Sequence, residues 1–410
     1  MKLKELKNKK ILILGFGREG KDTFFFLKKL FPGIILGIAD KQKKKGIKGH
    51  FGKNYLKSLE QYDLIVKSPG VPIHLPEVEK AFKEGKVTSQ TEIFLDNCPG
   101  IIVGVTGTKG KSTTASLIYK ILKKAGKKAH LVGNIEEPVL SHLLKANKND
   151  IFVCELSSHQ LYNLKKSPQV AVLLNIYPEH LDYYRDIKEY SKAKANITLY
   201  QGKNDFFVYN SQNRIVKGIA LKSKARKVAI SGEYYDLDKK AAASVARIFR
   251  VPEPLISKTI KGFRNLPYRL EKVGTFKGIT FYNDALATIP EATIGAIKTL
   301  GKVETIMLGG FERNIEFKNL AKEIIKSKIK TLILFPTTGK KIWEEVRKSG
   351  GGELKHFFVD NMEKAVLLAY EHTSSGKICL LSTASSSFSI FKDYREKGDL
   401  FRKYVRQYGA

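Results

Sequence analysis

The densest group of residues able to do chemistry is the stretch TGTKGKST at residues 106–113, which follows the apolar run 101–105. In a glycine-containing loop between a strand and a helix, backbone N–H groups point at a bound anion and cradle phosphates. Lys111 can bring a positive charge to the β- and γ-phosphate oxygens, and Ser112 can coordinate magnesium. The loop is shorter than the usual phosphate-loop spacing, because its first glycine is Gly107. A structural glycine turn would not need Lys-Ser-Thr at the helix start, so the stretch predicts binding of a nucleoside triphosphate.

Polar residues also follow two later apolar runs. Glu155 ends the run 151–155, and an acid at the end of a strand beside a phosphate loop can hold the magnesium ion that accompanies ATP. Without the phosphate loop, Glu155 would be read as a capping carboxylate. His180 follows the run 170–174, and Lys194 lies in the helix predicted after it. A lone histidine is more often structural than a ligand, and a lysine in so basic a chain is expected at the surface.

A second glycine-rich turn, GFGREG at residues 15–20, lies between a predicted strand (11–14) and a predicted helix that runs to residue 30. Asp40 ends the next predicted strand, 34–39. Such glycines let the backbone approach phosphates, and the carboxylate can bind a ribose hydroxyl, as in dinucleotide-binding folds. The motif alone is weak, because a structural tight turn, NAD binding and uridine diphosphate binding at the helix N-terminus all fit it.

The bulk properties are those of a soluble globular protein. With 410 residues the chain is long enough for two or three domains, and its 42% hydrophobic share is typical of globular proteins. No apolar run reaches the roughly 18 residues that span a bilayer, and the apolar stretch after the basic N-terminus is too short for a signal peptide. The three cysteines lie far apart and indicate neither disulfides nor a zinc site. We therefore expect a cytoplasmic protein.

The formal net charge of +33 comes from basic residues spread along the whole chain, with many more lysines than arginines. A single-strand nucleic-acid platform combines basic residues with interleaved aromatic side chains, and no basic block here has that pattern. We therefore expect a solvated basic surface that attracts anionic small molecules, and no nucleic-acid partner.

Apolar runs rich in Ile, Val and Leu alternate with amphipathic helical stretches, which predicts an α/β fold with parallel sheets. We expect three domains, at residues 1–96, 97–265 and 266–410. Strand candidates in the third are 305–308, 331–335 and 378–381, and the helix after the phosphate loop is predicted to run over 112–125 and end at Gly126.

The ordered set of motifs resembles the Mur ligase family. The motifs are GTKGKST at 107–113, GNI at 133–135, ELSSHQL at 155–161, the segment NIYPEHLD at 175–182 followed by YSKAK at 190–194, and NLPYR at 265–269. Within the family the C-terminal segment is most similar to the members that add D-glutamate, through YNDALAT at 282–288, LGG at 308–310 and LSTASSSF at 381–388 with FKDYREKGDLF at 391–401. The resemblance covers nearly the whole chain and keeps the order of the motifs.

This resemblance implies a fold and a reaction. The fold would be a Rossmann-like N-terminal domain that binds the UDP part of the substrate, a central P-loop ATP-binding domain with a parallel sheet, and a C-terminal Rossmann-like α/β domain. The reaction would be ATP-dependent addition of glutamate, with D-glutamate the expected form, to UDP-N-acetylmuramoyl-L-alanine through an acyl phosphate, in peptidoglycan precursor synthesis. Two magnesium ions, a carbamylated Lys194 and a monomer without a membrane span are also expected.

The resemblance also implies roles for individual residues. The catalytic residues would be Lys111, His180 and Lys194, and the metal ligands Ser112, Glu155, His180 and carbamylated Lys194. ATP would contact Gly107, Thr108, Lys109, Gly110, Lys111, Ser112, Thr113, Arg269 and Asp284. The UDP substrate would contact Gly15, Phe16, Gly17, Arg18, Gly20, Asp40, Ser68, Pro69, Gly70, Asn134 and Ser157. The amino acid would contact Thr288, Arg313, Ser387 and Tyr394.

Several positions depart from the family pattern. Ala285 stands where a serine is usual, Leu286 where some members have lysine, and His159 where an aromatic residue is common; the segment 311–313 also lacks the usual acid and lysine. These departures concern the amino-acid pocket and leave open a related ligase for another amino acid or for L-glutamate. An NAD-dependent oxidoreductase is the alternative of another class, but it leaves Lys111, His180 and Lys194 without a role.

Overall fold

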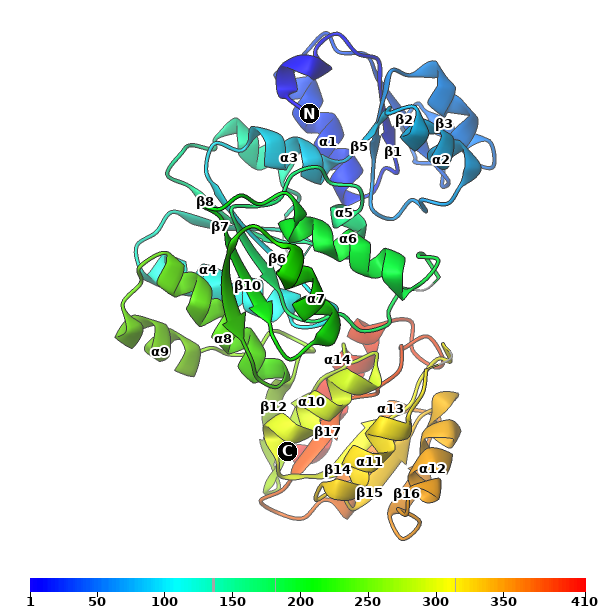
Figure 1. Cartoon of the computed structure of the whole chain (residues 1–410). Coiled ribbons are helices and arrows are strands. Elements are labelled where there is room, and N and C mark those ends of the chain that lie inside the picture. The colour runs from blue at the N-terminus through cyan, green and yellow to red at the C-terminus, as the bar shows by residue number, and fades with distance from the viewer. Residues whose placement is uncertain (135–136, 181, 314) are drawn as a thin grey trace. The chain divides into compact units, whose positions relative to one another are not determined.

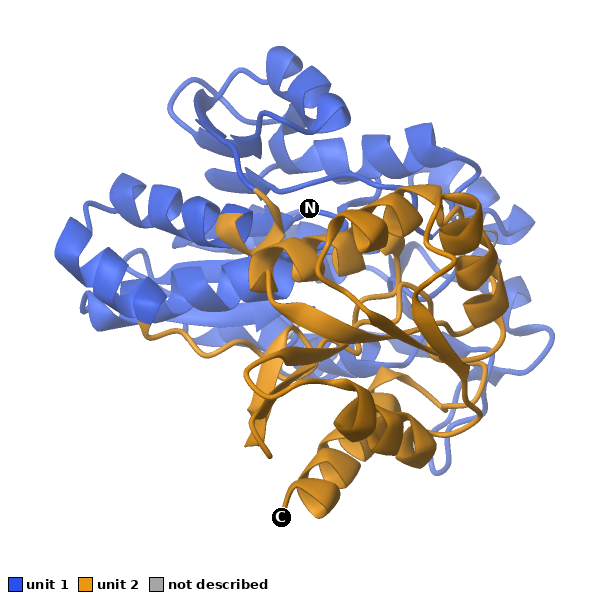
Figure 2. Ribbon diagram, turned by 90° about the horizontal axis from the view of Figure 1, so that it is seen from below, with its two compact units in different colours: residues 1–232, 237–261 blue, residues 233–236, 262–410 orange. Residues whose placement is uncertain are grey.

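The computed structural model describes residues 1–134, 137–180, 182–313 and 315–410. The chain divides into two compact units, the first of residues 1–232 and 237–261 and the second of residues 233–236 and 262–410 (Figure 2). Three sheets form the framework: two lie in the first unit and one in the second. In the described part of the chain no helix is both long and apolar enough to cross a membrane.

The N-terminal sheet has the strand order β3-β2-β1-β4-β5, with neighbouring strands parallel (Figure 1). Every residue of β1 is buried, because helices cover both faces of a parallel sheet. Its elements are η1 (Leu3–Leu6), β1 (Ile11–Leu14), α1 (Arg18–Leu30), β2 (Leu36–Asp40), β3 (His50–Phe51), η2 (Tyr55–Gln61), β4 (Leu64–Lys67), α2 (Pro76–Lys83), β5 (Val87–Thr88) and α3 (Gln90–Asn97).

The second sheet has the order β11-β10-β9-β6-β8-β7 and is also parallel. Because β6 lies between β8 and β9, the segments that follow these strands meet at one edge of the sheet. Its elements are β6 (Ile101–Thr106), α4 (Lys111–Lys124), β7 (Ala129–Gly133), η3 (Leu140–Leu144), β8 (Ile151–Glu155), α5 (Ser158–Leu161), β9 (Val170–Leu173), α6 (Ile187–Leu199), β10 (Phe206–Asn210), α7 (Arg214–Lys222), β11 (Arg226–Ile230), α8 (Tyr234–Ile248) and α9 (Glu253–Lys261).

The third sheet, in the second unit, has the order β12-β13-β17-β14-β15-β16. Only the edge pair β12–β13 is antiparallel among the pairings described in this sheet. Its elements are β12 (Glu271–Phe276), β13 (Ile279–Asn283), α10 (Pro290–Leu300), β14 (Val303–Leu308), α11 (Lys318–Lys326), β15 (Thr331–Leu334), α12 (Thr338–Lys348), β16 (Lys355–Phe358), α13 (Met362–His372), β17 (Ile378–Leu381) and α14 (Tyr394–Gly409).

The α/β class with parallel sheets is confirmed, and several predicted strands have the predicted bounds. The runs 11–14, 101–106 and 378–381 are β1, β6 and β17. The helix after the phosphate loop begins one residue early, at Lys111, and Gly126 follows its end with a φ of +71°, the left-handed conformation that suits glycine. The three domain boundaries stay predictions. Each predicted domain contains one sheet, whereas chain contacts group the first two sheets into one unit.

Candidate active site

The conformation of the phosphate loop between β6 and α4 depends on two glycines. Gly107 and Gly110 have φ values of +156° and +86°, which other residues rarely adopt. A side chain at Gly110 would also collide with the carboxylate of Asp238, because a Cβ there would lie 2.1 Å from Asp238 Oδ1. Lys111 Nζ donates to the carbonyl oxygens of Gly107 and Thr108, at 3.1 and 3.0 Å. The lysine therefore lies over its own loop, where phosphates would bind.

The segment after β9 holds this loop in place. Thr108 N donates to Asn175 O, and Lys109 N donates to Asn175 Oδ1, both at 2.8 Å. Lys109 Nζ also forms an ion pair with Glu179 Oε1 at 2.7 Å. Burial would raise the pKa of Glu179, but Lys109, His180 and Lys111 lower it to about 2. Glu179 is thus an anion that fixes the loop, a role the sequence reasoning missed because it treated the motif's histidine as the functional residue.

Glu155, at the end of β8, is 1% exposed. Its Oε1 accepts from Asn134 Nδ2 at 3.0 Å, while Oε2 is buried and has no hydrogen-bond partner among the described residues. A buried carboxylate oxygen without a donor is costly unless a cation or ligand satisfies it. Within the described residues no three His, Cys, Asp or Glu side chains form a ready-made metal cluster. Mg²⁺ is usually held by one or two carboxylates together with substrate phosphates and waters, and the unsatisfied oxygen of Glu155 suits that role.

Lys194 contradicts the composition-based expectation of a surface position, because it is 1% exposed on the inner face of α6. Its Nζ donates to Gly107 O at 2.9 Å and Thr106 Oγ1 at 3.3 Å, and lies 4.9 Å from the centroid of the Tyr190 ring. No carboxylate of a described residue pairs with it. Burial, and secondarily the charge of Lys111, hold the pKa of Lys194 well below its usual value. Its amine therefore loses its proton more easily than the amine of an exposed lysine does.

Two histidines lie near this edge of the sheet. The rings of His159 and His180 are 5.0 Å apart, centroid to centroid. Burial lowers the pKa of both imidazoles, that of His159 to about 3, so His159 is neutral at physiological pH and the neutral form of His180 is favoured. His180 has a φ of +58° and its carbonyl oxygen accepts from Tyr183 N and Tyr184 N. Ile135 and Leu181, from two of the sequence motifs, lie outside the described residues.

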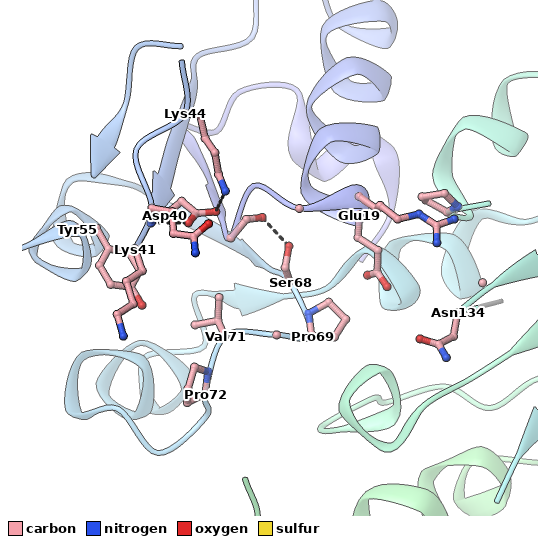
Figure 3. Close-up of a pocket in the computed structure, with 17 residues that line it drawn as sticks. Glu19, Asp40, Lys41, Lys44, Tyr55, Ser68, Pro69, Val71, Pro72 and Asn134 are labelled. Atoms are coloured by element: carbon pink, nitrogen blue, oxygen red, sulfur yellow. Dashed lines mark hydrogen bonds and ion pairs between the residues drawn. The ribbon is translucent and has the colours of Figure 1, made fainter. Parts of the chain in front are cut away.

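The glycine-rich turn after β1 forms one wall of a pocket of about 520 Å³ (Figure 3). Ser68 Oγ donates to Gly15 O at 2.6 Å, and a Cβ at Gly15 would lie 2.9 Å from Ser68 Cβ. Asp40 accepts from Phe16 N at 2.7 Å and from Gln42 N at 2.8 Å, and pairs with Lys44 at 3.4 Å. Asp40 therefore shapes the turn directly and still presents its carboxylate to the pocket.

The pocket unites most of the residues expected to bind the UDP substrate. From that group it is lined by Gly15, Gly17, Arg18, Asp40, Ser68, Pro69, Gly70 and Asn134. Phe16, Gly20 and Ser157 do not line it: Phe16 is buried, Gly20 packs against the backbone of Gly15, and Ser157 caps α5 through Gln160 N. Lining residues that were not expected to bind the UDP substrate are Glu19, Lys41, Gln42, Lys44, Tyr55, Val71, Pro72, Gly133 and Pro138.

Asn134 connects the pocket to the phosphate-loop edge. Its side chain lines the pocket and donates to Glu155, the acid proposed to face the metal. Glu19 also faces the pocket and accepts from Gln160 Nε2 at 2.7 Å. Burial raises the pKa of Glu19 to about 7, so this carboxyl is partly protonated at neutral pH. A substrate in the pocket would therefore meet Lys41, Lys44, the carboxylate of Asp40 and a partly protonated Glu19.

In the second unit, Asp284 lies at the end of β13 and is 4% exposed. Its Oδ1 accepts from Leu270 N at 3.0 Å and Tyr235 OH at 3.2 Å, and its Oδ2 accepts from Ser382 Oγ at 3.0 Å. Burial raises the pKa of Asp284 to about 7 despite these donors and the nearby Arg269. The hydrogen bond from Leu270 N brings Asp284 next to the residue that follows Arg269.

The residues expected to bind the amino acid are partly brought together. The Arg313 guanidinium lies 6.0 Å from the centroid of the Phe388 ring, and Phe311 N donates to Ser386 O at 2.8 Å. The buried hydroxyls of Ser386, Ser387 and Ser389 have no hydrogen-bond partner among the described residues. Arg313 and the serine-rich turn thus share one surface. Tyr394 begins α14 and packs against Tyr268. Thr288 follows Ala287, whose carbonyl oxygen accepts from Thr383 Oγ1 at 3.4 Å.

The chain matches known proteins over its whole length. Residues 105–260 match the Mur ligase middle domain. A UDP-N-acetylmuramoylalanine–D-glutamate ligase of Acetivibrio thermocellus is 34% identical, with 99% of this chain and 98% of that protein covered. One from Clostridium tetani is 32% identical, with 98% of each chain covered.

Solved structures share the fold at low sequence identity. A MurF ligase from Thermotoga maritima, solved in complex with ADP, has a TM-score of 0.61 at 16% identity, with 99% of this chain and 97% of that chain covered. A UDP-N-acetylmuramate–alanine ligase from the same organism has a TM-score of 0.58 at 16% identity, covering 98% and 99%. With sequence identity above 30% along the full chain to enzymes of one name, this protein belongs to the UDP-N-acetylmuramoylalanine–D-glutamate ligase family of Mur ligases.

Proposed function

We propose that this chain uses ATP to join D-glutamate to UDP-N-acetylmuramoyl-L-alanine, a step of peptidoglycan precursor synthesis in the cytoplasm. The observation that carries the proposal is the full-length similarity to ligases of that name. The geometry of the first unit supports it, because the phosphate loop, Glu155 and Lys194 lie at one edge of a sheet, with Asn134 leading from there to the large pocket.

The chemistry follows from the poor reactivity of a carboxylate as an acyl donor. A carboxylate oxygen of the UDP-linked substrate attacks the γ-phosphorus of ATP, the bond to ADP breaks, and an acyl phosphate forms. The neutral amine of glutamate then attacks the acyl carbon. The C–O bond to phosphate breaks, the amine loses a proton, and the phosphate leaves with one oxygen of the former carboxylate. Such a reaction depends mainly on positioning and on stabilising charge.

Residues of the phosphate loop would supply much of that charge stabilisation. Backbone N–H groups at the start of α4 and the ammonium of Lys111 would hold the phosphates. The Lys109–Glu179 pair would keep the loop in the conformation that presents them. Ser112, Glu155 and His180 are the proposed protein ligands of magnesium, which when bound adds positive charge to the transferring phosphoryl group.

The surroundings of Lys194 support the proposal that it is carbamylated. A neutral amine adds to the carbon of CO₂, forming an N–C bond and releasing a proton, and the product is an anionic carbamate. Lys194 meets the requirement because its pKa is lowered by burial and its Nζ contacts only uncharged acceptors among the described residues. A bare ammonium cannot ligate a metal, whereas a carbamate oxygen at this place could face the same cation as Glu155.

Arg313 is proposed to bind a carboxylate of glutamate, since its guanidinium fork suits bidentate contact. Arg313→Ala is expected to raise the glutamate KM at least tenfold, about 1.4 kcal/mol, with little change in KM for ATP or the UDP substrate. Steady-state kinetics with each substrate varied in turn measures this. Arg347→Ala, which removes an arginine from the end of α12, is the matched control. An unchanged glutamate KM would remove Arg313 from the pocket.

The function itself is tested by measuring phosphate release with single substrates omitted. Release is expected only when ATP, UDP-N-acetylmuramoyl-L-alanine and an amino acid are all present, and D-glutamate is expected to exceed L-glutamate and other amino acids. Release at full rate without the UDP substrate, or consumption of NADH in place of ATP, would refute the proposal. A preference for another amino acid would leave the proposed reaction standing and change only the amino acid that the enzyme adds.

A further inference from the structure

A buried lysine in the second unit has no place in the mechanism above. Lys397 lies in the first turn of α14 and is 1% exposed. Its Nζ donates to Thr383 Oγ1, which is the one hydrogen bond of this amine among the described residues. No carboxylate of a described residue lies at ion-pair distance from it. Holding an ammonium in the interior with a single neutral acceptor costs free energy that an apolar residue of the same length would not cost.

Thr383 is the point through which Lys397 reaches the serine-rich turn. Thr383 Oγ1 accepts from Lys397 Nζ at 2.6 Å. The same hydroxyl donates to Ser385 O at 3.0 Å, and Ala287 O lies 3.4 Å from it. Gly309 N donates to Thr383 O at 2.9 Å. One hydroxyl thus joins α14, the serine-rich turn and the segment after Asp284. The serine-rich turn carries Ser387 and the segment after Asp284 carries Thr288, two of the residues expected to contact the amino acid.

The electrostatic surroundings explain why a lysine is tolerated there. Burial lowers the pKa of Lys397 to about 7, and the buried carboxyl of Asp284 acts against this decrease. Asp284 is itself held by Leu270 N, Tyr235 OH and Ser382 Oγ. Ser382 directly precedes Thr383, so Asp284 and Lys397 hold two adjacent residues at the start of the serine-rich turn.

The backbone around Lys397 is fixed independently. Asn283 Nδ2 donates to Gly398 O at 3.1 Å, and a Cβ at Gly398 would lie 2.4 Å from Tyr268 Cδ1. Helix α14 is therefore docked beside β13 without help from the lysine side chain. Removing the Lys397 amine should change the turn that it contacts more than the position of the helix.

We propose that Lys397 is a positioning residue for the amino-acid substrate: through Thr383 it fixes the serine-rich turn, residues 382–387, in the conformation that binds glutamate. This inference rests on the proposed function and adds a residue that does not touch the substrate. Lys397 and Thr383 act together. Replacing either residue should weaken binding of glutamate more than binding of ATP or of the UDP substrate.

The test compares Lys397→Met, Thr383→Val and the double variant by steady-state kinetics. Methionine keeps the length of the side chain, and valine keeps the shape of threonine while removing its hydroxyl. Each single variant is expected to raise the glutamate KM about tenfold, with changes below about threefold in KM for ATP and the UDP substrate. The double variant should be no worse than either single variant, because both break the same contact. Lys397→Arg, which keeps a cationic donor, should retain most of the wild-type affinity for glutamate.

The control is Lys403→Met, which removes an exposed lysine from the same helix and should leave all three KM values unchanged. Equal losses for all substrates, additive effects in the double variant, or unchanged glutamate KM in Thr383→Val would each overturn the inference. If Lys397→Met fails to fold, the Thr383→Val result alone decides. Loss of the proposed function itself would appear differently, as wild-type protein without glutamate-dependent phosphate release.

Discussion

Replacing Lys111 with alanine is expected to lower kcat for phosphate release at least about a hundredfold, the usual cost of losing one charge-stabilising contact to a transition state. The ammonium lies over the loop carbonyls of Gly107 and Thr108, and backbone N–H groups cannot replace its full positive charge. The fold should persist, because Lys111 is the first residue of α4 and its side chain is only half-buried. Phosphate assays sampled at timed intervals measure kcat, and a thermal unfolding curve shows whether the fold persists.

Lys123→Ala is the matched control for Lys111, since it removes an exposed lysine from the last turn of the same helix. It should leave kcat within about twofold of the wild-type value, because surface charge at that distance is screened by salt. A Lys111→Ala enzyme with near-wild-type kcat would show that the loop does not hold the transferring phosphoryl group.

Replacing Lys194 with alanine is expected to reduce turnover by a similar factor, with partial recovery on addition of a short carboxylic acid. Alanine removes the nitrogen that would carry the carbamate, and a small acid can return an oxygen donor to the vacated space. The variant should fold, because the change also removes an amine whose burial is costly. Lys192→Ala, an exposed neighbour on α6, should behave like wild type.

The carbamate itself can be detected without an activity measurement. Wild-type protein equilibrated with ¹³C-labelled bicarbonate should show a ¹³C carbamate signal that Lys194→Ala lacks and Lys192→Ala retains. The same signal in Lys194→Ala would place the modification on another lysine. Unchanged turnover of Lys194→Ala would make Lys194 a structural residue of the loop.

The sequence predicted β1 and β6 well because both are continuous apolar runs that end at glycine-rich turns. The positions of β1 and β6, and the loop between β6 and α4, follow from that pattern and from Gly107 and Gly110. The antiparallel edge strand β12 was not predicted, because its burial pattern alternates weakly and its pairing with β13 depends on a turn at Lys277 and Gly278.

Burial and pairing at the site could not be read from residue type. Lys194, Lys397 and Glu179 looked like ordinary charged residues in a chain rich in charge, yet each is largely buried. What sets them apart is contact with residues distant in sequence, such as Lys397 with Thr383 or Lys109 with Glu179. A family motif pointed to Lys194. Lys397 and Glu19 also lie within quoted motifs, but nothing in those motifs assigned a role to either side chain.

The central claim is that the γ-phosphoryl group of ATP passes to the carboxylate of the UDP-linked substrate. The most direct test uses that substrate with ¹⁸O in the reacting carboxylate and follows the label by mass spectrometry of the released phosphate. The proposed mechanism predicts that each amide bond formed sends a single labelled oxygen into inorganic phosphate. Phosphate free of ¹⁸O, with amide formed at the normal rate, would contradict an acyl phosphate intermediate.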